Sequence, residues 1–233
     1  MRFLCGCLHR GSSEWSQMTD VVDKTRDEQF VIRHSLIDRL LHWVSAVSVL
    51  ILLFTAFLPI AGFKFSWVTI HWVSGFVLIA VSLFHVVRSC FWQDLHSMYF
   101  GSSDVKEIGA ALRWLLQRPD SELIKPGKYS PAQKLMHHSV SLIVLVTMIT
   151  GILMMVKIDT PWWDRDLYWL TDQSWGIVYI FHGLAALFLL AVIMIHIYFA
   201  FRPEKLMYTR SMISGKLTRA ELLDQHDPEK WRN

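Results

Sequence analysis

The chain has 233 residues, of which 53% are hydrophobic and 18% are charged, and its net charge is +3 at pH 7. This composition excludes an ordinary soluble domain and indicates an integral membrane protein. The small positive charge reflects where Lys and Arg are placed around the membrane, so we expect no nucleic acid among the partners.

Four segments are long and apolar enough to span a bilayer, because each holds about 20 mostly apolar residues. They run from Leu41 to Phe63, from Trp67 to Trp92, from Leu135 to Val156 and from Trp175 to Phe201. The sequence therefore predicts an all-α integral membrane protein, a bundle of four transmembrane helices within residues 31–201. A polar N-terminal arm, residues 1–30, precedes this domain, and a polar tail, residues 202–233, follows it.

The positions of Lys and Arg predict how the chain crosses the membrane. All but three of the 23 Lys and Arg residues lie near the N-terminus, around the second connection or in the tail; the three are Lys64, Lys157 and Arg165. Connections rich in these residues stay on the cytoplasmic side. We therefore expect a multi-pass protein of a bacterial inner membrane with both termini in the cytoplasm.

The second connection, from Gln93 to Lys134, is long for a loop and should contain structure of its own. Its apolar residues recur at helical spacing after Asp104, at Val105, Ile108, Leu112, Leu115 and Leu116. This pattern predicts an amphipathic helix, which either lies on the inner membrane surface or packs on the bundle as a solvated loop helix. With a short helix in the tail, it would form the cytoplasmic surface structure.

The fourth span carries two histidines, His182 and His196, fourteen positions apart. At about 1.5 Å and 100° per residue, they lie roughly 21 Å apart along a helix and about 40° short of whole turns, so they share a face. Ionisable residues inside a membrane are rare and usually functional. Two imidazoles on one face, near opposite ends of a span, suit two haems stacked across a bilayer.

Two bis-imidazole haems require two further ligands. His71 enters the second span from the outer side, which places it at the depth of His182. The candidates at the depth of His196 are His42, His85, His137 and His138. Spacing alone favours His85 over His42, because His85 follows His71 by the same fourteen residues. The alternative for any single intramembrane histidine is that it binds no iron and hydrogen-bonds to a backbone carbonyl.

Other side chains are candidates to support these ligands. The ring nitrogen that does not bind iron usually donates a hydrogen bond, and Ser45, Ser74 and Ser139 are candidate acceptors by sequence proximity. Arg88, near the inner end of the second span, could contact a haem propionate. The alternative for Arg88 is an interfacial arginine that snorkels toward water.

Several motifs in this chain resemble those of a known family. They are Ile37-Asp38-Arg39-x-x-His42-Trp43, Ile70-His71-x-x-x-Gly75, Gly127-Lys128-Tyr129-Ser130-Pro131-Ala132-Gln133-Lys134, His182-x13-His196-x-Tyr198 and the tail Ser214-Gly215-Lys216-Leu217-Thr218-Arg219. From about Val31 to Trp231, the chain resembles the cytochrome b (gamma) subunit of respiratory formate dehydrogenases. That subunit belongs to the wider group of bacterial cytochromes b561 and nickel–iron hydrogenase cytochromes b.

The resemblance implies a cytochrome b with two b haems that carries electrons across the membrane to a quinone, either menaquinone or ubiquinone. The electrons would come from an iron–sulfur beta subunit and, through it, from a molybdenum or tungsten catalytic alpha subunit. The chain itself would do no formate chemistry. The implied haem ligands are His71 and His182 for the outer haem and His42 and His196 for the inner haem. His42 thus replaces His85, because the family has no ligand at the position of His85.

The resemblance also implies a quinone pocket beside the inner haem, near the Gly-Lys-Tyr loop. It would involve Ser130, Gln133 and His196, with His137 and His138 among the groups that could relay protons. This chain departs from the family at Ser130-Pro131-Ala132, where an asparagine, a small residue and a glycine are common. Serine can still hydrogen-bond a quinone carbonyl, although its reach is shorter.

Three alternatives use the same sequence features. The first is the cytochrome b of a nickel–iron hydrogenase or thiosulfate reductase, for which the same ligands would serve. The second is a stand-alone b561-type quinone oxidoreductase, against which the long second connection and the tail motif count. The third is a haem-free membrane anchor or metal transporter.

Overall fold

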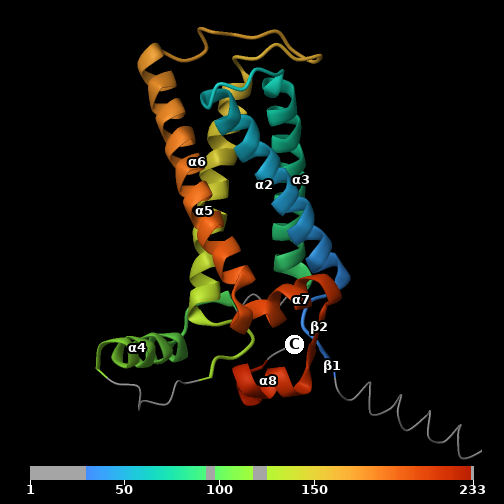
Figure 1. Ribbon diagram of the computed structural model, residues 1–233. Helices are drawn as coiled ribbons and strands as arrows, with labels where there is room; N and C mark the ends of the chain where they lie inside the picture. The colour runs from blue at the N-terminus through green and yellow to red at the C-terminus, as the bar shows by residue number, and fades with distance from the viewer. Residues whose placement is uncertain (1–29, 93–97, 118–124, 232–233) are drawn as a thin grey trace, which may run out of the picture.

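The computed structural model describes residues 30–92, 98–117 and 125–231. Four long helices form an elongated bundle (Figure 1): α2 (Leu36–Ile60), α3 (Trp67–Trp92), α5 (Pro131–Met155) and α6 (Asp172–Phe201). Each is long and apolar enough to cross a membrane, which confirms the predicted four-helix membrane bundle. The predicted N-terminal arm lies almost entirely outside the described residues.

Capping residues explain why two helices begin earlier than the apolar runs predict. The Ser35 side chain accepts a hydrogen bond from the backbone N–H of Asp38, and the Asp38 carboxylate accepts one from the Ser35 N–H. Ser130 and Gln133 form the same reciprocal cap at the start of α5, with Pro131 as its first residue. Such boxes satisfy backbone donors that a helix start leaves unpaired, so α2 begins at Leu36 and α5 at Pro131.

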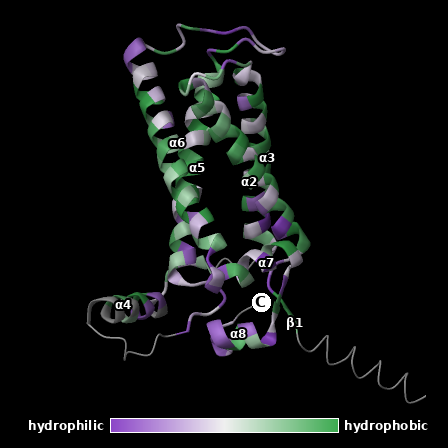
Figure 2. Cartoon of the chain, viewed as in Figure 1, coloured by the Kyte–Doolittle hydropathy of each residue, from purple (hydrophilic) through white to green (hydrophobic). Residues whose placement is uncertain are grey.

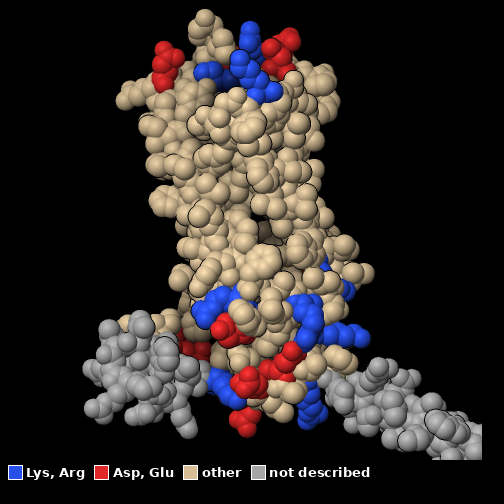
Figure 3. Space-filling model, viewed as in Figure 1, with Lys and Arg blue, Asp and Glu red and all other residues tan. Residues whose placement is uncertain are grey.

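The four helices pack as two hairpins, α2 with α3 and α5 with α6. A small core joins both hairpins through Val49, Leu53, Leu78 and Leu189. Many other apolar side chains are exposed, and Figure 2 shows that hydrophobic residues occur along the whole length of the bundle. On the face shown in Figure 3, Lys, Arg, Asp and Glu gather at the two ends and leave an uncharged belt between them. This is the surface of a protein whose solvent is lipid.

The first and last described residues lie at the same end of the bundle, here called the terminal end (Figure 1). The tail follows α6 through a 3₁₀ turn (Pro203–Lys205), α7 (Leu206–Ser214), β2 (Lys216–Thr218), α8 (Arg219–Gln225) and a second 3₁₀ turn (Pro228–Lys230). Strand β1 (Phe30–Ile32) pairs with β2 in antiparallel register, Val31 opposite Leu217. This two-stranded pairing is an addition to the predicted all-helical fold. Which end faces the cytoplasm stays a prediction.

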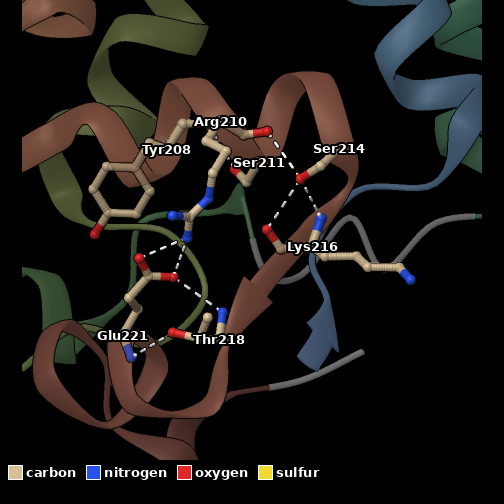
Figure 4. A network of polar contacts seen from close by, with 7 residues as sticks. All are labelled: Tyr208, Arg210, Ser211, Ser214, Lys216, Thr218 and Glu221. Atoms are coloured by element: carbon tan, nitrogen blue, oxygen red, sulfur yellow. Dashed lines mark hydrogen bonds and ion pairs between the residues drawn. The ribbon is translucent and has the colours of Figure 1, made fainter. Parts of the chain in front are cut away.

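A glycine and an ion pair shape the tail. Gly215 ends α7 with φ +83°, and a Cβ there would lie 2.8 Å from the carbonyl oxygen of His34. Any other residue would be strained at this backbone angle and would also clash. Figure 4 shows Arg210 paired with Glu221, whose carboxylate also accepts the backbone N–H of Thr218 at the start of α8. The tail is therefore a folded cap against the N-terminal strand.

A buried histidine ties this tail to the loop before α5. His226 is fully buried, its Nδ1 lies 2.6 Å from the carbonyl oxygen of Gly127, and its Nε2 lies 3.0 Å from Nη1 of Arg33. Arginine can only donate, so Nε2 accepts and Nδ1–H donates to Gly127. The loop before α5 and the tail are in close contact here, because a Cβ on Gly127 would lie 2.7 Å from the carbonyl oxygen of Lys230.

Acidification is expected to loosen this end of the molecule. Burial lowers the pKa of His226 to about 4, and burial together with Arg33 lowers the pKa of His34 to about 4. Between pH 6.5 and 4, a histidine in the unfolded chain, with a pKa near 6.5, is protonated, whereas His226 and His34 in the folded protein are not. Stability is therefore lost as the pH falls from about 6.5 toward 4, by up to about 1.4 kcal/mol per pH unit for each group.

Hydrogen exchange measured at pH 7 and at pH 5, corrected for the intrinsic rates, tests this expectation. Protection of α8 should fall at pH 5, whereas protection in the middle of α5 should not. Equal protection of α8 at both pH values would contradict it.

The amphipathic helix predicted in the second connection is α4 (Ser102–Gln117), which extends to one side of the terminal end (Figure 1). A buried ion pair holds its start, with Lys134 Nζ 2.9 Å from Asp104 Oδ2. Val105, Ile108 and Leu112 are exposed rather than packed on the bundle. This favours the membrane-surface alternative over a helix packed on its own bundle.

Candidate functional site

Two pairs of histidines face each other across the bundle. The ring centroids of His71 on α3 and His182 on α6 lie 6.4 Å apart, and those of His42 on α2 and His196 on α6 lie 6.2 Å apart. Helix α6 supplies one histidine to each pair, and the α2–α3 hairpin supplies the other. The fourteen-residue spacing on α6 places the pairs at two depths, roughly 21 Å apart.

The structure assigns the rival histidines to another place. His85 on α3 lies opposite His137 on α5, with ring centroids 6.1 Å apart, whereas the imidazole beside His196 is that of His42. His138 points elsewhere, since its Nε2 lies 3.0 Å from the carbonyl oxygen of Met98. Spacing along α3 alone thus favoured a histidine that the fold directs toward α5.

Threonines on neighbouring helices fix the tautomer of the His71/His182 pair. Thr55 Oγ1 lies 2.8 Å from His71 Nδ1 and donates its own proton to the carbonyl oxygen of Ile51, 2.7 Å away. A hydroxyl has one proton, so toward His71 the Thr55 oxygen acts as the acceptor. The proton of His71 is therefore on Nδ1, and Nε2 keeps its lone pair.

The α5–α6 hairpin repeats this arrangement. Thr150 Oγ1 donates to the carbonyl oxygen of Val146 at 2.7 Å and lies 2.8 Å from His182 Nδ1. His182 is therefore also protonated on Nδ1. The serines named from sequence proximity are not these acceptors: Thr55 and Thr150 lie on the partner helix of each hairpin, which proximity along the chain does not reveal.

This arrangement fits haem iron. Two imidazoles whose nitrogens each lie about 2 Å from one metal ion have ring centroids roughly 6 Å apart. Both pairs on α6 have this spacing, and so does the His85/His137 pair, so the spacing alone does not select the ligands. A ligating imidazole must be neutral and present a lone pair, and its other nitrogen must donate a hydrogen bond. His71 and His182 meet these conditions through Thr55 and Thr150.

Removal of either threonine hydroxyl is expected to weaken haem binding at the His71/His182 pair. Loss of a partner that orients a ligating histidine typically lowers metal affinity 10- to 100-fold, so Thr55→Ala and Thr150→Ala should release one haem faster to an excess of apomyoglobin. Thr→Ser at the same positions should restore retention. Thr147→Ala is the control, since within the described residues the Thr147 hydroxyl bonds only to the carbonyl oxygen of Val144. Equal release from all variants would contradict the role of Thr55 and Thr150.

The helix cap of α5 leaves hydrogen-bond donors free at the terminal end. Ser130 Oγ accepts from the Gln133 N–H at 3.3 Å, and Gln133 Oε1 accepts from the Ser130 N–H at 2.9 Å. The cap therefore uses the acceptor atom of each side chain. The Ser130 O–H and the Gln133 amide N–H groups have no partner in the described part of the chain, and donors are what a quinone carbonyl needs.

Arg88 and Lys134, by contrast, are engaged within the protein. Arg88 pairs with the Asp38 carboxylate and donates to the Ser35 hydroxyl at 3.1 Å, while Lys134 is held by Asp104. Arg88 thus fastens the end of α3 to the start of α2. A contact between Arg88 and a haem propionate stays a prediction.

Known proteins with similar sequences identify the family of this chain. A family model described as prokaryotic cytochrome b561 matches residues 33–215. The chain belongs to the prokaryotic cytochrome b561 family. Relatives of this cytochrome include the nitrate-inducible formate dehydrogenase cytochrome b556(Fdn) subunits of Escherichia coli (strain K12) and Shigella flexneri. Each is 23% identical over 215 residues, which cover 88% of this chain and 91% of the relative. Membership implies that this multi-pass membrane protein binds haem b.

Proposed function

We propose that this cytochrome is the membrane subunit of a formate dehydrogenase and carries electrons to quinone through two b haems. His71 and His182 would hold one haem, and His42 and His196 would hold the other. The observation that carries the proposal is the presence of two facing imidazole pairs at two depths, both built on one face of α6.

The residues of the chain have separable roles in this function. Haem b supplies reversible one-electron chemistry when bound. Thr55 and Thr150 hold the Nδ1 protons of His71 and His182 and so keep the Nε2 lone pairs available. The apolar cluster of Val49, Leu53, Leu78 and Leu189 excludes water between the hairpins. Electrons would enter at the end opposite the termini and leave at the terminal end.

Quinone reduction would take place near the His42/His196 pair. The donors of Ser130 and Gln133 suit the carbonyl oxygen of menaquinone or ubiquinone, and His196 would lie beside it. Each quinone takes up two electrons and two protons to become quinol. Under the orientation predicted from Lys and Arg, these protons come from the cytoplasm of a bacterium, whose inner membrane would hold the protein.

The proposed partners rest on the named relatives, which are cytochrome subunits of a formate dehydrogenase and match along nearly their full length. An iron–sulfur beta subunit would dock at the end opposite the termini and would connect the cytochrome to a catalytic alpha subunit containing molybdenum or tungsten. Oxidation of formate would then belong entirely to the partner.

A pyridine haemochrome titration of the purified chain, with a reduced-minus-oxidised spectrum, tests the central claim. We expect two b haems per chain. A chain purified from haem-replete cells with no haem would overturn the proposal and favour an anchor or transporter. A content of one haem per chain would mean that one of the two imidazole pairs does not bind haem.

A further inference from the structure

One buried polar atom at the end opposite the termini has no partner. Trp175 is 2% exposed, yet its Nε1 forms no hydrogen bond within the described part of the chain. An indole has a single N–H and no acceptor, so this is the only hydrogen bond that the Trp175 side chain can make. Buried polar groups are paired in the great majority of cases, and an exception calls for an explanation, such as a partner outside the protein chain.

The position of Trp175 on α6 places this missing partner near the His71/His182 pair. Trp175 precedes His182 by seven residues on α6. Seven residues are about 20° short of two turns and about 10.5 Å along the axis. Trp175 therefore lies on the face of α6 that carries His182, outward of the His71/His182 pair.

A cation lies at the same place. Lys157 Nζ is 4.8 Å from the ring centroid of Trp175 and 5.3 Å from that of Tyr179. The two rings are stacked, with centroids 6.2 Å apart. This cation–π contact holds a positive charge beside a buried N–H donor. Both groups favour an acceptor with negative charge, because a charge-assisted hydrogen bond is stronger than a neutral one.

We propose that Trp175 Nε1 donates a hydrogen bond to a carboxylate side chain of the haem held by His71 and His182, with Lys157 balancing its charge. The inference rests on the proposed haem placement and adds two residues to it. It assigns to Trp175 a positioning and tuning role rather than a catalytic one. A carboxylate without this donor keeps more negative charge near the iron, which favours the ferric state.

Redox potentiometry on the full-length, haem-loaded protein in detergent tests the proposal, together with resonance Raman spectra of the propionate bending modes. Trp175→Phe should lower the midpoint potential of one haem, leave the other unchanged and shift one propionate mode. Trp163→Phe is the matched control at the same end of the bundle, because the Trp163 indole N–H already donates to the carbonyl oxygen of Met155 at 3.2 Å. It should change neither potential nor the spectrum.

Each possible result either supports or overturns the proposal. Unchanged potentials and propionate modes in Trp175→Phe would overturn the proposal and point to a buried water as the partner. If Trp175→Phe loses a haem, Trp175→His decides, because it keeps an aromatic donor: recovery of the haem supports the hydrogen bond, and continued loss overturns it in favour of packing alone. A wild-type protein without haem would refute the proposed function itself, which is a separate outcome.

Discussion

Replacement of His42 with leucine is expected to lower the haem content from two b haems per chain to one, whereas His85→Leu should leave it at two. His42 faces His196 across the bundle, with ring centroids 6.2 Å apart, while His85 faces His137. Leucine has a comparable volume and no lone pair, so it removes an iron ligand without adding a polar group to the membrane. The measurement is a haemochrome titration, normalised to protein, on both variants.

The same logic extends to the other ligands and supplies internal controls. His182→Leu should remove the other haem, and a His42→Leu/His182→Leu double variant should contain none. Because the two haems occupy different sites, the difference spectra of the single variants should sum to that of the wild type. Loss of haem from His85→Leu with retention in His42→Leu would show that His85, and not His42, is the haem ligand.

The sequence predicts the bundle well because membrane helices are local features. Each span is a run of about 20 apolar residues that satisfies its own backbone hydrogen bonds, and the described part of the chain contains four such helices. The expectation that His182 and His196 are ligands rests on the same kind of information, since their separation along one helix fixes both depth and face. Helix starts at Ser35 and Ser130 follow from capping, which apolar runs do not encode.

The spacing of residues along one helix does not predict their contacts with other helices. His85 repeats the fourteen-residue interval after His71, yet the fold turns it toward His137. Thr55 and Thr150 lie inside apolar runs, and only the packing of each hairpin reveals that they bond to a histidine on the next helix. The pairing of β1 with β2 joins segments some 185 residues apart. None of these contacts leaves a periodic signal in the sequence.

Replacement of Asp104 with alanine is expected to free the start of α4 from the bundle. Asp104 and Lys134 form a buried ion pair, and Asp104 also accepts the backbone N–H of Gly101 at 2.7 Å. Removal of one member of a buried pair leaves the other charge without compensation, at a cost of about 3–5 kcal/mol. Since each 1.4 kcal/mol is about a factor of ten in an equilibrium constant, trypsin cleavage after the exposed Lys106 should become about 100 times faster or more.

Two further variants show whether the buried charge is the cause. Asp159→Ala breaks an exposed pair with Arg165, whose members are 63% and 58% exposed, and exposed pairs contribute only about 0–1 kcal/mol, so cleavage at Lys106 should not change. Asp104→Ala combined with Lys134→Met removes both charges and should recover most of the protection, because no uncompensated ammonium then remains buried. If the double variant is cleaved as fast as Asp104→Ala, the helix cap at Gly101 and not the ion pair holds α4 in place.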